Sequence, residues 1–110
     1  MEIVELEKNG IHILKIIGRV DTGNAIVLDS SLNAAVADGK NKMVLDLSEL
    51  TYISSAGLRT FADILALNKV KDGDLKLAAV NPKILRILQI IGFDQYFSIH
   101  DSVDDAVEAF

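Results

Sequence analysis

The chain has 110 residues, the usual length of one domain and enough to bury a core without disulfides or metals. It has no cysteine, so disulfide frameworks, thiolate metal sites and cysteine nucleophiles are excluded. Eleven basic against sixteen acidic side chains give a net charge of −5, which argues against binding nucleic acid or anionic lipid. No apolar stretch reaches membrane-spanning length, and the N-terminus lacks the pattern of a signal peptide. We therefore expect one cytoplasmic domain over residues 1–110.

The first two predicted elements are strands joined by a tight turn. Residues 3–7 and 11–17 alternate apolar with polar side chains, which is typical of half-buried strands. Asn9 and Gly10 between them accept the two positive φ angles of a type I′ turn. The chain is therefore predicted to open on an antiparallel hairpin.

Helices and strands then alternate to the end of the chain. Apolar residues at helical spacing predict a helix over 25–36, which Gly39 ends, and the apolar run 43–47 suits a strand covered on both faces. A helix with its apolar stripe over 58–65 and a strand over 75–80 are expected next. Three elements follow them: a helix over 82–91 after the cap Asn81, a short strand over 97–99, and a last helix capped by Asp101 or Ser102. This order predicts an α/β fold, in which the hairpin leads into a mostly parallel sheet of about five strands with about four helices.

Few residues are candidates for metal, cofactor or catalytic chemistry. His12 and His100 lie near opposite ends of the chain without metal-ligand spacing, and no glycine-rich phosphate loop is present. Asp72-Gly73-Asp74 matches a calcium loop for three residues only, so a helix-to-strand turn is the better interpretation. We therefore expect no metal, no cofactor and no catalytic residue.

The segment 47–58 leaves a buried strand and enters a helix, at the sheet edge where parallel folds build their sites. Ser55-Ala56-Gly57 matches the second half of a hydrolase nucleophile elbow, but Ile53 replaces the first glycine. No histidine is well placed to act as its base. A catalytic Ser55 is therefore disfavoured. A small hydrolase is kept as the rival function, and covalent labelling by a serine-reactive phosphonate would test it.

Two interpretations of the serines stay open on local grounds. In the simpler one, Ser54 or Ser55 caps the helix. Gly57 is a poor residue for a first helical turn, which would make sense if a large group must approach the backbone closely. In the second interpretation the serine is phosphorylated, because a phosphate is tolerated at a helix N-terminus but is costly to bury in an apolar interface. Such a group would act as a binary switch of a complex.

One family shares these features. Its resemblance rests on Asp46-Leu47-Ser48, on Ile53-Ser54-Ser55-Ala56-Gly57-Leu58, and on Gly18-Arg19-Val20-Asp21 after the second strand. Together they resemble the STAS domain of bacterial anti-sigma factor antagonists, over essentially the whole chain. The resemblance implies a partner that is both an anti-sigma factor and a serine kinase, and whose capture frees the sigma factor. It also implies that the kinase phosphorylates the antagonist and that a PP2C-type phosphatase reverses the modification.

Residue by residue, the resemblance makes Ser55 the phospho-acceptor, two positions before Gly57. Asp21 matches a loop aspartate near that serine, and Gly57 and Leu58 match the helix entry. Ser54 stands where an aspartate is frequent in the family and offers a second hydroxyl, so phosphorylation at Ser54 stays open as the lesser alternative. From the residues alone, Asp21 is equally well a loop or cap residue before the first helix, with Thr22 and Asn24 as the other candidate caps.

The partner surface is expected where the loop after the second strand meets the start of the second helix. Four apolar residues on the second and third helices are either exposed contacts for the kinase or, more commonly, part of a covered face, namely Ile64, Leu67, Ile87 and Ile90. An alternative within the same family is a STAS scaffold subunit of a stress-signalling or lipid-transport assembly, in which the fold acts structurally.

Overall fold

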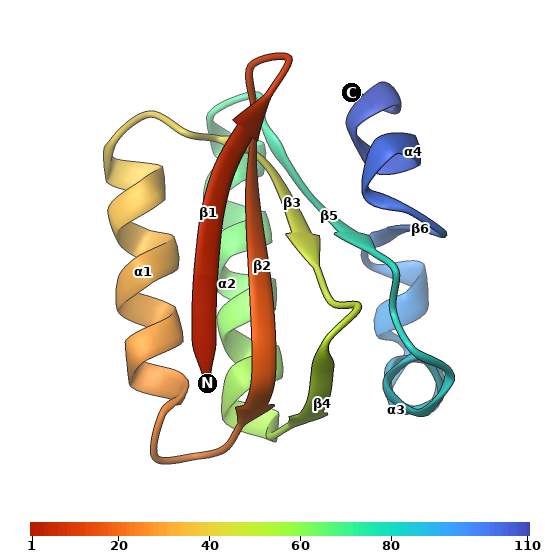
Figure 1. Cartoon of the computed structure of the whole chain (residues 1–110). Helices are drawn as coiled ribbons and strands as arrows, with labels where there is room; N and C mark the ends of the chain where they lie inside the picture. The colour runs from red at the N-terminus through yellow and green to blue at the C-terminus, as the bar shows by residue number, and fades with distance from the viewer.

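The chain opens on the predicted hairpin. In the computed structural model, which describes residues 1–110, β1 (Glu2–Lys8) pairs antiparallel with β2 (Ile11–Val20) (Figure 1). Asn9 and Gly10 have φ angles of 54° and 78°, which are the left-handed values that the turn requires. The hairpin prediction is thus confirmed, and its turn residues fix the register.

Helices and strands alternate after the hairpin. They are α1 (Ala25–Ala37), β3 (Lys42–Asp46), β4 (Leu50–Ile53), α2 (Ser55–Val70), β5 (Asp74–Ala78), α3 (Pro82–Ile90), the 3-10 turn η1 (Phe93–Gln95), β6 (Ser98–His100) and α4 (Val103–Glu108). The strands form one six-stranded sheet in the order β1-β2-β3-β5-β6, and β4 pairs with the far end of β2. Every pairing after the hairpin is parallel. The predicted α/β fold with four helices is confirmed, and β4 is the strand that the sequence pattern did not reveal.

Two apolar cores cover the two faces of the sheet. On β3, Met43 and Leu45 join the larger core with α1, α2 and α3, whereas Val44 joins a smaller core with α4. All three side chains are fully buried, which explains the unbroken apolar run of this strand. The smaller core is completed from α4 by Ala106 and Val107.

Local caps set the starts of the later helices. Asn81 accepts a hydrogen bond from the Ile84 amide at 2.9 Å, and Pro82 occupies the first helical position of α3. Ser102 rather than Asp101 caps α4 and accepts from the Asp105 amide at 3.1 Å. Each of these capping signals therefore acts as expected.

None of the four helices is both long and apolar enough to cross a bilayer.

The parallel strands bring their carboxyl ends to one edge of the sheet. β2 ends there at Val20, β4 at Ile53 and β5 at Ala78, and α1, α2 and α3 begin shortly after these residues. The loops entering the three helices consequently lie at this edge, which is the lower end of the molecule in Figure 1.

Candidate functional site

One backbone hydrogen bond brings the site together. β2 and β4 pair Arg19 with Tyr52 and Val20 with Ile53, and the Ser54 amide then donates to the Val20 carbonyl at 2.8 Å. Asp21 directly follows Val20, so the strand pairing brings its loop to the start of α2 (Figure 1). Two motif segments more than thirty residues apart in the sequence thus meet, as the resemblance predicts.

The two neighbouring serines have different environments. Ser54 is the N-cap of α2, is 7% exposed, and accepts from the Gly57 amide through Oγ at 3.2 Å. Ser55 is the first helical residue and is exposed, and its hydroxyl takes part in no hydrogen bond of the chain. Ser54 therefore has the capping role, while the hydroxyl of Ser55 is accessible to another molecule.

The first turn of α2 has amides to offer an anion. The Ser54 amide donates to the Val20 carbonyl, and the Gly57 amide donates to the Ser54 hydroxyl. The amides of Ser55 and Ala56 are left without an intrahelical acceptor. The first turn contains no acidic residue. The helix itself therefore carries no carboxylate that compensates the positive end of its dipole.

Gly57 has a packing role in the core. A Cβ atom on this buried residue would lie 2.8 Å from Cγ1 of both Ile53 and Val20. The glycine is therefore required because α2 packs closely on the ends of β4 and β2, and the large groups that approach this backbone are side chains of the chain's own core. Leu58 follows it into the core at 6% exposure.

Asp21 combines a structural contact with an exposed position. Its Oδ1 accepts from the Asn24 amide at 2.8 Å, and Asn24 Oδ1 accepts from the Asp21 amide at 2.9 Å. The Asp21 carbonyl also accepts from Ala25 at 3.0 Å, so the loop is held in a fixed entry to α1. Asp21 is thus a loop residue that bonds Asn24, the N-cap of α1, and is not itself the cap. Its carboxylate is exposed at the edge that carries Ser55.

Two exposed apolar residues follow this loop. Ile26 is 70% exposed and Val27 is 53% exposed, both in the first turn of α1. The sequence interpretation missed them, although both fall outside the apolar stripe of that helix, which was a usable signal. Of the apolar positions left open on the other helices, Ile64 is buried, Ile87 is half-buried, and Leu67 and Ile90 are exposed.

Groups that could activate a serine lie elsewhere. His12 Nε2 contacts Glu5 Oε1 at 2.9 Å, and His100 Nε2 contacts Ser98 Oγ at 2.7 Å. Neither imidazole bonds to Ser55, so the site contains no nucleophile–base pair of the kind a hydrolase needs.

The pKa values that depart clearly from normal also belong to groups away from the site. The hydrogen bond from Lys15 to Glu49 raises the pKa of Lys15. The pKa of Asp74 is lowered, because partial burial, which raises it, is outweighed by the Leu75 amide and the Lys76 ammonium. Asp74 begins β5 after the left-handed Asp72, so this segment is the expected turn.

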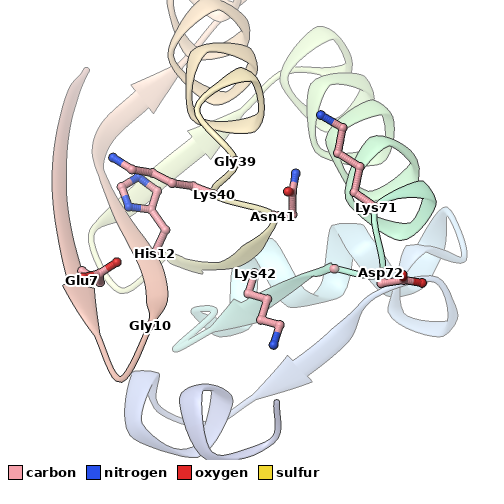
Figure 2. A pocket seen from close by; sticks show the side chains of 10 residues that line it. Glu7, Gly10, His12, Gly39, Lys40, Asn41, Lys42, Lys71 and Asp72 are labelled. Atoms are coloured by element: carbon pink, nitrogen blue, oxygen red, sulfur yellow. The ribbon is translucent and has the colours of Figure 1, made fainter.

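A polar cavity of about 360 Å³ lies at the opposite edge of the sheet. It is lined by Glu7, Gly10, His12, Gly39, Lys40, Asn41, Lys42, Lys71, Asp72 and Gly73. Figure 2 shows that Lys42 and Lys71 extend away from each other instead of converging on one point. No group of three acidic or histidine side chains that could hold a metal ion is present in the chain. The cavity contains none of the residues of the candidate site.

Known proteins share both the sequence and the fold. BtrV of Bordetella bronchiseptica is 35% identical over 102 residues, which cover 93% of this chain and 88% of BtrV. The crystal structure of an anti-sigma factor antagonist from Mycobacterium paratuberculosis is 27% identical, covers 98% of this chain and 92% of its own, and has a TM-score of 0.84.

Two further structures show the same fold at low identity. SpoIIAA, an anti-sigma factor antagonist of Bacillus, has been solved in its unphosphorylated and phosphorylated forms. Both forms are 12% identical to this chain with a TM-score of 0.76, covering 98% of this chain and 96% and 98% of theirs. The STAS domain model itself matches residues 2–106. The chain therefore belongs to the STAS domain family.

Proposed function

We propose that this protein is an anti-sigma factor antagonist. It binds an anti-sigma factor that is also a serine kinase, thereby frees the sigma factor, and is switched off when Ser55 is phosphorylated. The observation that carries the proposal is the division between the serines: Ser54 is buried and bonded, whereas Ser55 is exposed and unbonded at the start of α2. The names of related STAS proteins support the same activity.

The modification is an ordinary phosphoryl transfer. The Ser55 oxygen attacks the γ-phosphorus of ATP, the bond from that phosphorus to ADP breaks, and the hydroxyl proton passes to a base of the kinase. This chain supplies only the acceptor, so the proposal requires neither a catalytic residue nor a cofactor in it. A PP2C-type phosphatase hydrolyses the phosphoserine and restores the active form in the cytoplasm.

The fold tolerates the phosphate because it meets the amides of Ser55 and Ala56 at the positive end of α2. The two forms of SpoIIAA, which match this fold equally well, support that tolerance. A docked complex does not tolerate it. The phosphate adds about −1.5 to −2 charge at the sheet edge that also carries the Asp21 carboxylate, and burying it against a partner that contacts Ile26 and Val27 requires costly desolvation.

The test is a phosphorylation assay with matched serine variants. The wild-type protein, Ser54→Ala and Ser55→Ala are each incubated with the cognate anti-sigma kinase and ATP, then analysed by intact mass and peptide mapping. We expect one phosphate on the wild-type protein and on Ser54→Ala, and none on Ser55→Ala. A phosphate on Ser54 in the Ser55→Ala variant, or no modification of the wild type, would contradict the proposal.

A structural scaffold subunit would behave differently. Its binding would not change when Ser55 carries a phosphate, because its contacts would be permanent. Comparing the affinity of the phosphorylated and unphosphorylated forms for the same partner therefore separates the two functions.

A further inference from the structure

The exposed face of α3 carries two cations and no acidic side chain. Lys83, Arg86 and Ile90 are spaced three and four residues apart, so they lie on one side of the helix. Ile84 and Leu88 lie on the other side and are buried in the larger core. α3 contains no acidic residue, although acidic side chains outnumber basic ones in the whole chain.

The two cations of this face are free. Five lysines elsewhere form ion pairs, namely Lys8, Lys15, Lys40, Lys69 and Lys76. Lys83 and Arg86 are exposed and take part in none. Their charge is therefore available to another molecule.

Large apolar side chains are exposed at the end of α3 and after the turn η1 that follows it. Ile90 is 73% exposed, Ile91 47% and Tyr96 70%. The Tyr96 ring lies 6.2 Å from that of Phe93 and 6.4 Å from that of the buried Phe97, so the aromatic contacts hold it in place. Exposed apolar and aromatic residues beside arginine are typical of protein–protein interfaces.

The α3 surface (Lys83, Arg86, Ile90, Ile91 and Tyr96) is connected to the candidate site through β4. The Asn81 side chain at the start of α3 donates to the Leu50 carbonyl at 2.6 Å, and β4 runs from Leu50 to Ile53, directly before Ser54. Figure 1 shows α3 beside β4, whose other end leads into α2. A partner that covers Ser55 can therefore extend over β4 to α3.

We propose that the α3 surface binds an acidic, partly apolar segment of the same anti-sigma factor that recognises Ser55; this inference rests on the proposed function. In a two-fold dimer through this surface, a second copy would bring the same two cations against each other, and the net charge of −5 opposes binding to an anionic membrane. The α3 surface does not contain Ser55, so this contact supplies affinity without reporting the phosphorylation state.

The test reverses the charge at two places that differ only in position. Lys83→Glu/Arg86→Glu removes the cations of the α3 surface. Lys42→Glu/Lys71→Glu makes the same change in net charge at two exposed, unpaired lysines on the opposite edge of the sheet. Affinity for the anti-sigma kinase is measured by calorimetry at low and high salt, and circular dichroism establishes that each variant is folded.

We expect the α3 variant to bind about tenfold more weakly, with a smaller salt dependence, and the control to stay within about twofold of wild type. A neutral variant, Ile90→Ser, is expected to weaken binding without changing the salt dependence. Equal affinities of the α3 variant and the control would overturn the inference. If Ser55 phosphorylation still abolished binding, the proposed function would survive that result. Failure of the wild-type protein to bind the kinase would overturn both.

Discussion

The Ser54 hydroxyl accepts a hydrogen bond from the Gly57 amide at 3.2 Å, so the cap of α2 is bonded to the residue that sets how closely α2 packs. Both residues are buried, and Ser55 lies between them on the surface. The side chain that stabilises the helix start and the hydroxyl that is accessible to a partner thus belong to different residues. Substitutions at the three positions are consequently expected to have different effects.

Loss of the cap is expected to affect stability alone. Ser54→Ala removes the acceptor for the Gly57 amide and should lower the free energy of unfolding by about 1 kcal/mol in urea denaturation. Ser54→Asp keeps a capping oxygen near the helix dipole and should remain close to wild type. Equal losses in both variants would show that the hydroxyl cap is not the stabilising contact.

Gly57→Ala sets two effects against each other. Alanine improves helix propensity by about 1 kcal/mol, but the added Cβ would lie 2.8 Å from Val20 and Ile53, and such overpacking costs about 1–3 kcal/mol. We expect a net loss of about 1 kcal/mol in urea denaturation. Adding Val20→Ala removes one of the clashing carbons, so the effect of Gly57→Ala should be smaller in that background. An equal effect in both backgrounds would contradict the packing role.

Substitutions of Ser55 are expected to change binding and leave the fold intact. Ser55→Ala removes the acceptor without adding charge and should bind the kinase constitutively, also after incubation with ATP. Ser55→Asp adds a negative charge and should weaken binding, while the midpoint of urea denaturation stays near that of wild type because the side chain is exposed. Tight binding of Ser55→Asp would argue against the charge mechanism.

The exposed apolar turn of α1 should contribute to docking. Ile26→Ser is expected to weaken binding of the anti-sigma kinase by about tenfold, because this side chain is 70% exposed beside the loop of Asp21. Val70→Ser is the matched control, since Val70 is 84% exposed at the far end of α2. Surface plasmon resonance on both variants tests this, and equal affinities would place the contact elsewhere.

Acid stability should depend on Asp74. Its pKa is lowered below the usual value of 3.8, because the Leu75 amide and the Lys76 ammonium outweigh the effect of partial burial. The folded state therefore binds this proton less readily than the unfolded state. The resulting stabilisation is complete above the unfolded pKa and is lost as the pH falls through the folded pKa.

The Asp74→Asn variant, whose side chain does not titrate, provides the comparison. The difference in unfolding free energy between this variant and the wild-type protein should be constant near neutral pH and should shrink below about pH 4. Urea denaturation at a series of pH values measures it. A difference that does not change with pH would mean that the carboxylate is not coupled to folding.

Local signals in the sequence were sufficient for most of the fold. The Asn9-Gly10 turn, the Asn81 cap and the apolar run around Val44 each act through residues close in the sequence, and the structure confirms them. β4 could not be predicted in this way. It has only four residues, with both ends buried and the middle more exposed, and its partner is the far end of β2.

The candidate site was likewise predictable from the sequence only where its features depend on neighbouring residues. The motif identified the serines, but the choice between Ser54 and Ser55 as the cap depends on the burial of each side chain. The reason for Gly57 is also tertiary, since Val20 and Ile53 reach it from two strands. Ile26 and Val27 were recognisable as apolar residues outside their helix stripe, although only the structure shows their exposure.

The bond between the Ser54 amide and the Val20 carbonyl anchors the beginning of a sixteen-residue helix to the sheet. Ser55 is consequently presented from a rigid support, and a partner that docks there loses little conformational entropy by ordering it. The lifetime of each signalling state would then be governed by the enzymes that add and remove the phosphate, not by a slow rearrangement of this domain.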